Sequence, residues 1–106
     1  MRLTDLDPQW ILKDGARVGF TFLSPVQGDG MGRTRWRQSC FPNPTPSEEQ
    51  DDLLGDAPVQ RCNPSCGWTI AGGIEAASFE TMSVTPSIDG SPGGLWHGFI
   101  TNGEIR

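Results

Sequence analysis

The chain ends with the sequence Leu95-Trp96-His97-Gly98-Phe99-Ile100-Thr101-Asn102-Gly103-Glu104-Ile105-Arg106. Asn-Gly between two arms of alternating apolar residues is a strong hairpin signal, because both positions of such a turn need a positive φ. With Asn102 and Gly103 at the turn, the expected pairs are Thr101–Glu104, Ile100–Ile105 and Phe99–Arg106. We therefore predict that a β-hairpin closes the sheet at this end of the chain.

Side chains that pair across a hairpin point to the same face of the sheet. The face predicted to join the core carries Trp96, Ile100 and Ile105. The opposite face is mixed in character and carries His97, Phe99, Thr101, Glu104 and Arg106. We therefore expect His97, which is the single histidine of the chain, to be partly exposed.

The rest of the chain also reads as β structure. Its 106 residues include 14 Gly and 9 Pro, and these fall between short apolar runs as turn signals. Alternating apolar residues predict strands at 9–12, joined by Asp14-Gly15 to 17–22, and at 34–41, 66–71 and 82–85, while 86–94 reads as a loop. We predict one mainly β (β-rich α+β) domain over 1–106, a small antiparallel sheet or sandwich of five to seven strands.

The segment 42–61 is rich in Pro and acidic residues and reads as an insertion. Pro42, Pro44 and Pro46 exclude a central strand, because proline cannot donate to a β-ladder. Thr45-Pro46-Ser47-Glu48 predicts the start of a short helix, with Thr45 as its N-cap and Pro46 in its first turn. Gly55 is expected to end this helix after two turns at most.

The overall charge limits the classes of partner. A formal net charge of −5 disfavours direct binding to nucleic acid but suits a basic protein surface. The start Met-Arg-Leu-Thr-Asp lacks the apolar run of a secretory segment, and no stretch is long enough to span a bilayer. With an odd count of three cysteines, this predicts a cytoplasmic protein with reduced thiols and no membrane contact.

Two regions carry a resemblance to a known family. Thr85-Pro86-Ser87-Ile88-Asp89 followed by Trp96-His97-Gly98-Phe99-Ile100-Thr101-Asn102-Gly103-Glu104-Ile105 resembles the C-terminal hallmark of small uncharacterised phage and prophage accessory proteins. Leu3–Trp10 and Val18–Phe22 resemble their N-terminal pattern. The resemblance implies a phage-associated gene acting in the cytoplasm of a host bacterium, and it brings no activity with it. Related chains often have Cys-Pro-x-Cys where this chain reads Leu23-Ser24-Pro25-Val26, so a shared metal site is not implied.

The cysteines and the histidine suggest a structural zinc site. Cys62 and Cys66 have a spacing found in zinc ligands, and Cys40 and His97 are the residues that can complete a Cys₃His tetrahedron. The alternative is that the cysteines are free thiols acting as small apolar side chains. A Cys62–Cys66 disulfide is disfavoured in a reducing compartment.

Two further groups of residues have both a functional and a structural interpretation. Ser87 or a cysteine, with His97 and Asp89, has the composition of a nucleophilic triad, but no nucleophile elbow surrounds them, so turn capping is favoured. Arg33, Arg35 and Arg37 alternate on one face of a strand. They suit a phosphate or carboxylate partner, but pairing with the acidic segment of the same chain is favoured.

The acidic segment is the preferred candidate for binding a partner. Five carboxylates within nine residues on a short helix can imitate a row of phosphates, although a solvated face is the more common case. Trp10 is a candidate aromatic anchor beside them. The predicted partner-binding residues are Glu48, Glu49, Asp51, Asp52, Asp56 and Trp10.

These observations favour a protein that binds another protein over an enzyme. The first hypothesis is a phage-encoded inhibitor of a bacterial defence system, of the anti-CRISPR type, which binds a host complex with a basic surface. The second is a virion decoration or assembly protein. The third is a small zinc-binding protein or zinc-dependent enzyme.

Overall fold

The computed structural model describes residues 1–27 and 35–106, which form two four-stranded sheets. The first sheet has the order β1 (Gln9–Lys13), β2 (Ala16–Leu23), β3 (Arg37–Cys40) and β4 (Val59–Gln60). The second has the order β5 (Thr69–Ile70), β6 (Val84–Asp89), β7 (His97–Thr101) and β8 (Glu104–Ile105). The described residues also form the helix α1 (Ser47–Leu54) and the 3₁₀ turns η1 (Leu3–Leu6), η2 (Ile74–Ala76) and η3 (Ser91–Gly93).

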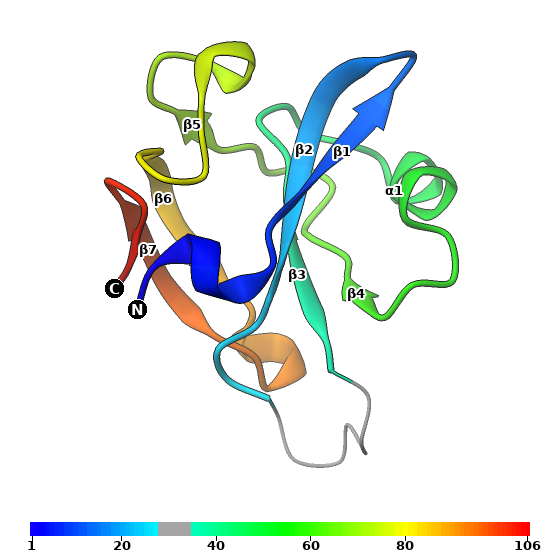
Figure 1. Cartoon of the computed structure of the whole chain (residues 1–106). Coiled ribbons are helices and arrows are strands. Elements are labelled where there is room, and N and C mark those ends of the chain that lie inside the picture. Colours follow the sequence, from blue (N-terminus) through cyan, green and yellow to red (C-terminus); the bar gives the residue numbers. More distant parts are fainter. Residues whose placement is uncertain (28–34) are drawn as a thin grey trace.

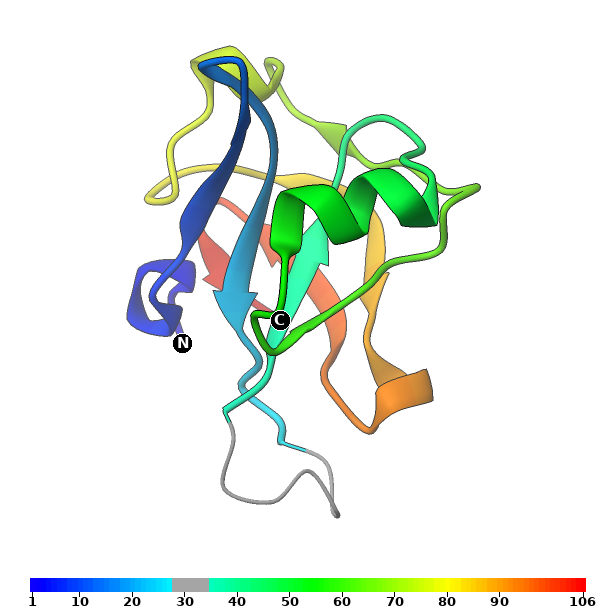
Figure 2. The ribbon, with the colours of Figure 1, turned by 90° about the vertical axis from the view of Figure 1, so that its right-hand side faces the viewer.

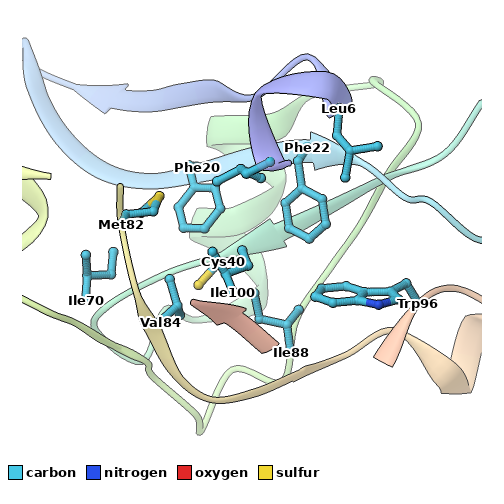
Figure 3. Close-up of a cluster of buried hydrophobic side chains, with 11 residues drawn as sticks. Leu6, Phe20, Phe22, Cys40, Ile70, Met82, Val84, Ile88, Trp96 and Ile100 are labelled. Carbon is cyan, nitrogen blue, oxygen red and sulfur yellow. The ribbon is translucent and has the colours of Figure 1, made fainter. Parts of the chain in front are cut away.

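The two sheets face each other across the hydrophobic core, and α1 lies on the other side of the first sheet (Figures 1 and 2). The first sheet contributes Phe20, Phe22 and Cys40 to this core. Figure 3 shows how these side chains meet those of the second sheet and its flanks, which are Ile70, Met82, Val84, Ile88, Trp96 and Ile100. The prediction of a β-rich α+β fold is confirmed. None of the helices in the described part of the chain is long and apolar enough to cross a membrane.

The closing hairpin has the predicted register. Ile100 pairs with Ile105, and Asn102 and Gly103 have φ angles of 49° and 75°. The N-terminus lies along this hairpin, because the Leu3 N–H donates to the Gly103 carbonyl at 2.8 Å. The two chain ends therefore lie side by side (Figure 1).

The first hairpin is also confirmed. Asp14 and Gly15 have φ angles of 52° and 82°, and Lys13 pairs with Ala16 across them. The predicted faces of the closing hairpin agree with the burial, since Trp96 and Ile100 are buried while His97 is exposed.

Four details differ from the sequence-based expectations. The described residues form eight strands rather than five to seven. The strand predicted at 82–85 continues to Asp89, because its pairing with β7 is irregular between Val84 and Ile88 and so tolerates a proline that cannot donate. Thr45 does not cap α1, since its hydroxyl donates to the Asn43 carbonyl and the helix begins two residues later. The strand β4 pairs with β3 in parallel, in a segment expected to hold no strand.

A glutamine side chain joins the two sheets inside the core. Gln38 of β3 is 2% exposed, and its amide accepts a hydrogen bond from the Trp96 N–H at 3.1 Å and donates to the Trp96 carbonyl at 3.0 Å. The Gln38 side-chain amide therefore makes the same pair of hydrogen bonds to the Trp96 backbone that a residue of a neighbouring β-strand would make. Gly90 packs against it, and a Cβ atom there would lie 2.6 Å from the Gln38 Nε2 atom.

Replacing Gln38 with Leu is expected to lower the free energy of unfolding by about 1–3 kcal/mol, because two buried backbone groups lose a partner. Urea denaturation followed by tryptophan fluorescence measures this change. Gln9→Leu is the control, since Gln9 is exposed and its side-chain amide bonds only to Asp7 among the described residues. Equal stabilities of the two variants would show that the Gln38 amide contributes nothing.

Gly103→Ala is expected to lower the free energy of unfolding by about 2–5 kcal/mol. Its φ is +75°, and an added Cβ would lie 2.1 Å from the Glu80 carbonyl oxygen. Gly72→Ala is the matched control, because Gly72 has a φ of +80° but has no atom within 4 Å of the added Cβ. The loss of stability in Gly72→Ala therefore measures only the cost of placing a non-glycine residue at a positive φ, which is about 1–2 kcal/mol. Similar losses for the two variants would contradict the packing of the hairpin turn against Glu80.

Candidate functional site

A cleft of about 590 Å³ lies between the segment after β4 and the strand β6. One wall comes from the segment that follows β4 and contains Arg61, Cys62 and Cys66. The other wall comes from Trp68 and from the strand β6 with the turn after it, and its residues are Pro86, Ser87, Asp89 and Pro92. The volume suits a small organic molecule.

Ser87 and Asp89 line this cleft, and His97 lies beside them on the neighbouring strand. His97 pairs with Asp89 across β7 and β6, and Ser87 lies two residues before Asp89 on the same strand. The His97 Nε2 atom is 3.1 Å from the Ser87 Oγ atom, while its Nδ1 atom is 3.9 Å from the Asp89 Oδ1 atom. The indole N–H of Trp68 donates to the Ser87 carbonyl at 3.1 Å and so holds the strand beside the cleft.

Turn capping, the favoured interpretation from the sequence, describes Asp89 but not Ser87. The Asp89 Oδ1 atom accepts hydrogen bonds from the Ser91 N–H at 2.9 Å and from the Ser91 hydroxyl at 2.5 Å. These hydrogen bonds lower the pKa of the Asp89 carboxyl, which therefore stays ionised near neutral pH. Ser87 instead bonds to His97, so the sequence pattern underestimated how closely this pair approaches.

The predicted zinc ligands are not brought together. Cys40 is buried in the core between the two sheets. His97 is exposed on the outer face of β7, on the side of the second sheet that faces away from this core. Cys62 is half-buried and Cys66 is exposed. Among the residues that the structure describes, no group of three or more His, Cys, Asp or Glu side chains is placed to hold a metal ion.

The three thiols differ in their surroundings. Burial raises the pKa of the Cys40 thiol well above its usual value, and the nearby Cys62 raises it further. Burial also raises the pKa of the Cys62 thiol, partly offset by a hydrogen bond with Ser39. Both thiols are therefore protonated near neutral pH, which makes them poor nucleophiles.

We expect thiol titration at pH 8 with a coloured disulfide reagent to proceed in three steps. Cys66 reacts first because it is exposed, Cys62 reacts more slowly, and Cys40 reacts only when the chain unfolds. Raising the pH accelerates the second step, because it deprotonates a thiol whose pKa is raised. Cys66→Ala removes the first step only. Rapid modification of Cys40 in the folded chain would contradict its position in the core.

The acidic segment lies on α1 and the residues that follow it. Two of its five carboxylates form ion pairs, Glu49 with Lys13 and Asp51 with Arg61 at 3.0 Å. The other three are exposed and form no ion pair in the described part of the chain, namely Glu48, Asp52 and Asp56.

The two described members of the predicted arginine stripe, Arg35 and Arg37, form no ion pair with this segment. Arg37 forms an ion pair with Asp7 at 3.1 Å, and its Nε atom donates to the Thr21 hydroxyl at 3.0 Å. The prediction that the arginine pairs within the chain is therefore confirmed for Arg37, but the predicted partner was wrong. Arg35 is exposed. Arg33 lies outside the described residues.

A groove of about 220 Å³ lies between α1 and the first sheet, and its lining includes Leu53, Leu54, Leu12 and Trp10. Trp10, the candidate aromatic anchor, is half-buried and stacks on Phe79 with ring centroids 4.2 Å apart. Leu12 in this groove is 57% exposed.

A second buried glutamine, which the sequence did not indicate as important, fixes α1. The Gln50 side chain is fully buried and donates to the carbonyls of Thr45 at 2.9 Å and Cys62 at 3.0 Å. Its Oε1 atom accepts from the Cys62 N–H at 3.0 Å. Gln50 therefore ties the acidic helix to the cleft wall that carries Arg61 and Cys62.

Two surfaces of the described structure are thus suited to act on another molecule. The cleft is lined by the Ser87 hydroxyl and the Asp89 carboxylate, and the His97 imidazole lies next to both on the neighbouring strand. The helix α1 presents unpaired carboxylates beside an exposed leucine. In comparisons with protein-family models, curated proteins and solved structures, the chain matches none of them.

Proposed function

We propose that the protein acts by binding a basic surface of a protein complex in a bacterial host, through the exposed face of α1. The observation that carries this proposal is the set of three exposed carboxylates without an ion pair among the described residues, Glu48, Asp52 and Asp56. Carboxylates that no internal cation neutralises are available to a cationic partner.

The rigidity of α1 supports the proposal. Gln50 holds the helix from its buried side through three hydrogen bonds to backbone groups, so the carboxylates project from a fixed support. A binding surface fixed before the complex forms loses less conformational entropy on association. The Lys13–Glu49 ion pair adds a contact between α1 and β1.

The groove beside α1 supplies the apolar part of the proposed interface. Leu12 is exposed next to Leu53 and Leu54, which are partly buried. Charged contacts speed association and set orientation, whereas desolvated apolar anchors provide most of the affinity. The proposed surface combines both features on one side of the first sheet.

The phage-like hallmark at the two ends of the chain suggests the class of partner. A phage accessory protein with acidic groups in a row fits a site on a host defence complex that otherwise holds a nucleic-acid backbone. We therefore propose an inhibitor of the anti-CRISPR type. The first partner to test is a CRISPR effector with its guide RNA.

Neutralising two unpaired carboxylates, Glu48→Gln with Asp52→Asn, is expected to weaken binding to the effector about tenfold at low salt, since each lost contact between exposed charges costs up to about 1 kcal/mol. The decisive measurements are the affinity and the residual cleavage of target DNA at increasing concentrations of the protein. Added salt is expected to weaken the unchanged protein toward the level of this variant, because salt screens exposed charges.

The matched control is Glu75→Gln with Glu80→Gln, which removes the same charge from exposed carboxylates outside α1. This control is expected to retain nearly full affinity. An equal loss of affinity in the two double variants would show that only the overall charge matters, and it would refute a specific role for α1. Abundant copies of the protein in purified phage particles, with no inhibition, would favour the virion component instead.

A further inference from the structure

We propose that Ser87 is a nucleophile activated by His97, and that it accepts an acyl group from an ester bound in the adjacent cleft. The ester class is a carboxylic ester with an apolar or aromatic portion. This inference is independent of the binding surface on α1, because the cleft lies at β6 and α1 contributes no residue to its lining.

The first argument is the geometry of the hydroxyl and the imidazole. The Ser87 Oγ atom lies 3.1 Å from the His97 Nε2 atom, which is within the range for proton transfer to a general base. In the tautomer that carries its proton on Nδ1, His97 accepts the hydrogen bond from Ser87 through Nε2. Of the two ring nitrogens, Nε2 therefore faces the nucleophile.

The second argument is the carboxylate on the other side of the ring. The Asp89 Oδ1 atom lies 3.9 Å from the His97 Nδ1 atom, and two hydrogen bonds from Ser91 hold it in place. A fixed negative charge at this position stabilises the imidazolium that forms when His97 takes the serine proton. The distance is longer than a hydrogen bond, as catalytic contacts often are before a substrate binds.

The third argument is the access of a substrate. Ser87 and Asp89 both line the cleft of about 590 Å³, so the hydroxyl meets a space large enough for a small ester. Trp68, Pro86 and Pro92 form apolar parts of the lining. These side chains favour an apolar or aromatic portion of the ester over a highly charged one.

The chemical step balances without a cofactor. The Ser87 Oγ atom attacks the carbonyl carbon while its proton passes to the His97 Nε2 atom, and a bond from Oγ to carbon forms. The bond from carbon to the leaving oxygen then breaks, and the leaving alcohol takes the proton from His97. The products are an acylated Ser87 and a free alcohol. In a second step His97 takes a proton from a water molecule, the water oxygen attacks the acyl carbon, and the acid leaves while His97 returns the proton to Ser87.

The indole N–H of Trp68 already donates to the Ser87 carbonyl, so it is not free to stabilise an oxyanion. Stabilisation of the oxyanion is usually a large part of catalysis by such enzymes. We therefore expect both acylation of Ser87 and release of the acyl group to be slow, because each step passes through an oxyanion.

The experiment treats the full chain with an alkyl fluorophosphonate and identifies the modified peptide by mass spectrometry. The Ser87 oxygen attacks phosphorus, fluoride leaves, and His97 takes the proton, so the probe reports the activated hydroxyl directly. We expect Ser87 to be labelled about a hundredfold faster in the folded chain than in urea, the size of effect that a positioned general base provides. The exposed Ser65, which bonds to Asn63 in a turn, is the internal control and stays unlabelled.

His97→Gln is the critical variant, because glutamine can keep a hydrogen bond to Ser87 but is not a base of comparable strength. Circular dichroism verifies that this variant is folded, and labelling is expected to fall to the rate in urea. Ser87→Ala removes the label at this peptide. Labelling of Ser87 no faster than of Ser65, or equal labelling in folded His97→Gln, would overturn the proposal while leaving the binding function of α1 untouched.

Discussion

The hydrogen bonds between the Gln38 amide and the Trp96 backbone are the interaction on which the rest of the structure depends. They cross the core from one sheet to the other, and both partners are buried. The Ser24 hydroxyl also accepts from the Trp96 N–H at 3.2 Å, so the start of β7 is held from two sides. Because His97 follows Trp96 directly, the same hydrogen bonds fix the position of the His97 imidazole on the exposed face of β7.

Gln50 repeats this arrangement on the other side of the first sheet. Its buried amide bonds to backbone groups of Thr45 and Cys62, which fixes α1 and one wall of the cleft at once. The other wall contains β6, which pairs with β7, the strand that begins directly after Trp96. The Trp96 contacts therefore also position this wall. Two glutamines therefore position both surfaces discussed above, the acidic helix and the cleft. A small domain with a modest core gains specificity from such fully bonded polar groups.

Local signals in the sequence were enough to predict much of the fold. Asn102-Gly103 predicted the closing register, Asp14-Gly15 the first hairpin, and the alternation at Phe20 and Phe22 the core face of β2. Contacts between distant residues were not predictable in this way. Gln38 and Gln50 are polar, so periodicity gave no reason to predict that their side chains are buried. The cleft geometry depends on the pairing of β6 with β7 beyond Pro86, in a stretch whose composition is typical of a loop.

The central claim is that α1 is the surface through which this protein binds its partner. Hydrogen-exchange mass spectrometry on the free and partner-bound protein tests this claim most directly, since it reports every segment in one experiment. The account predicts that slowed exchange on binding is concentrated in peptides covering 47–56 and the adjoining strand β1. Unchanged exchange in these peptides, with protection confined to the second sheet, would contradict it.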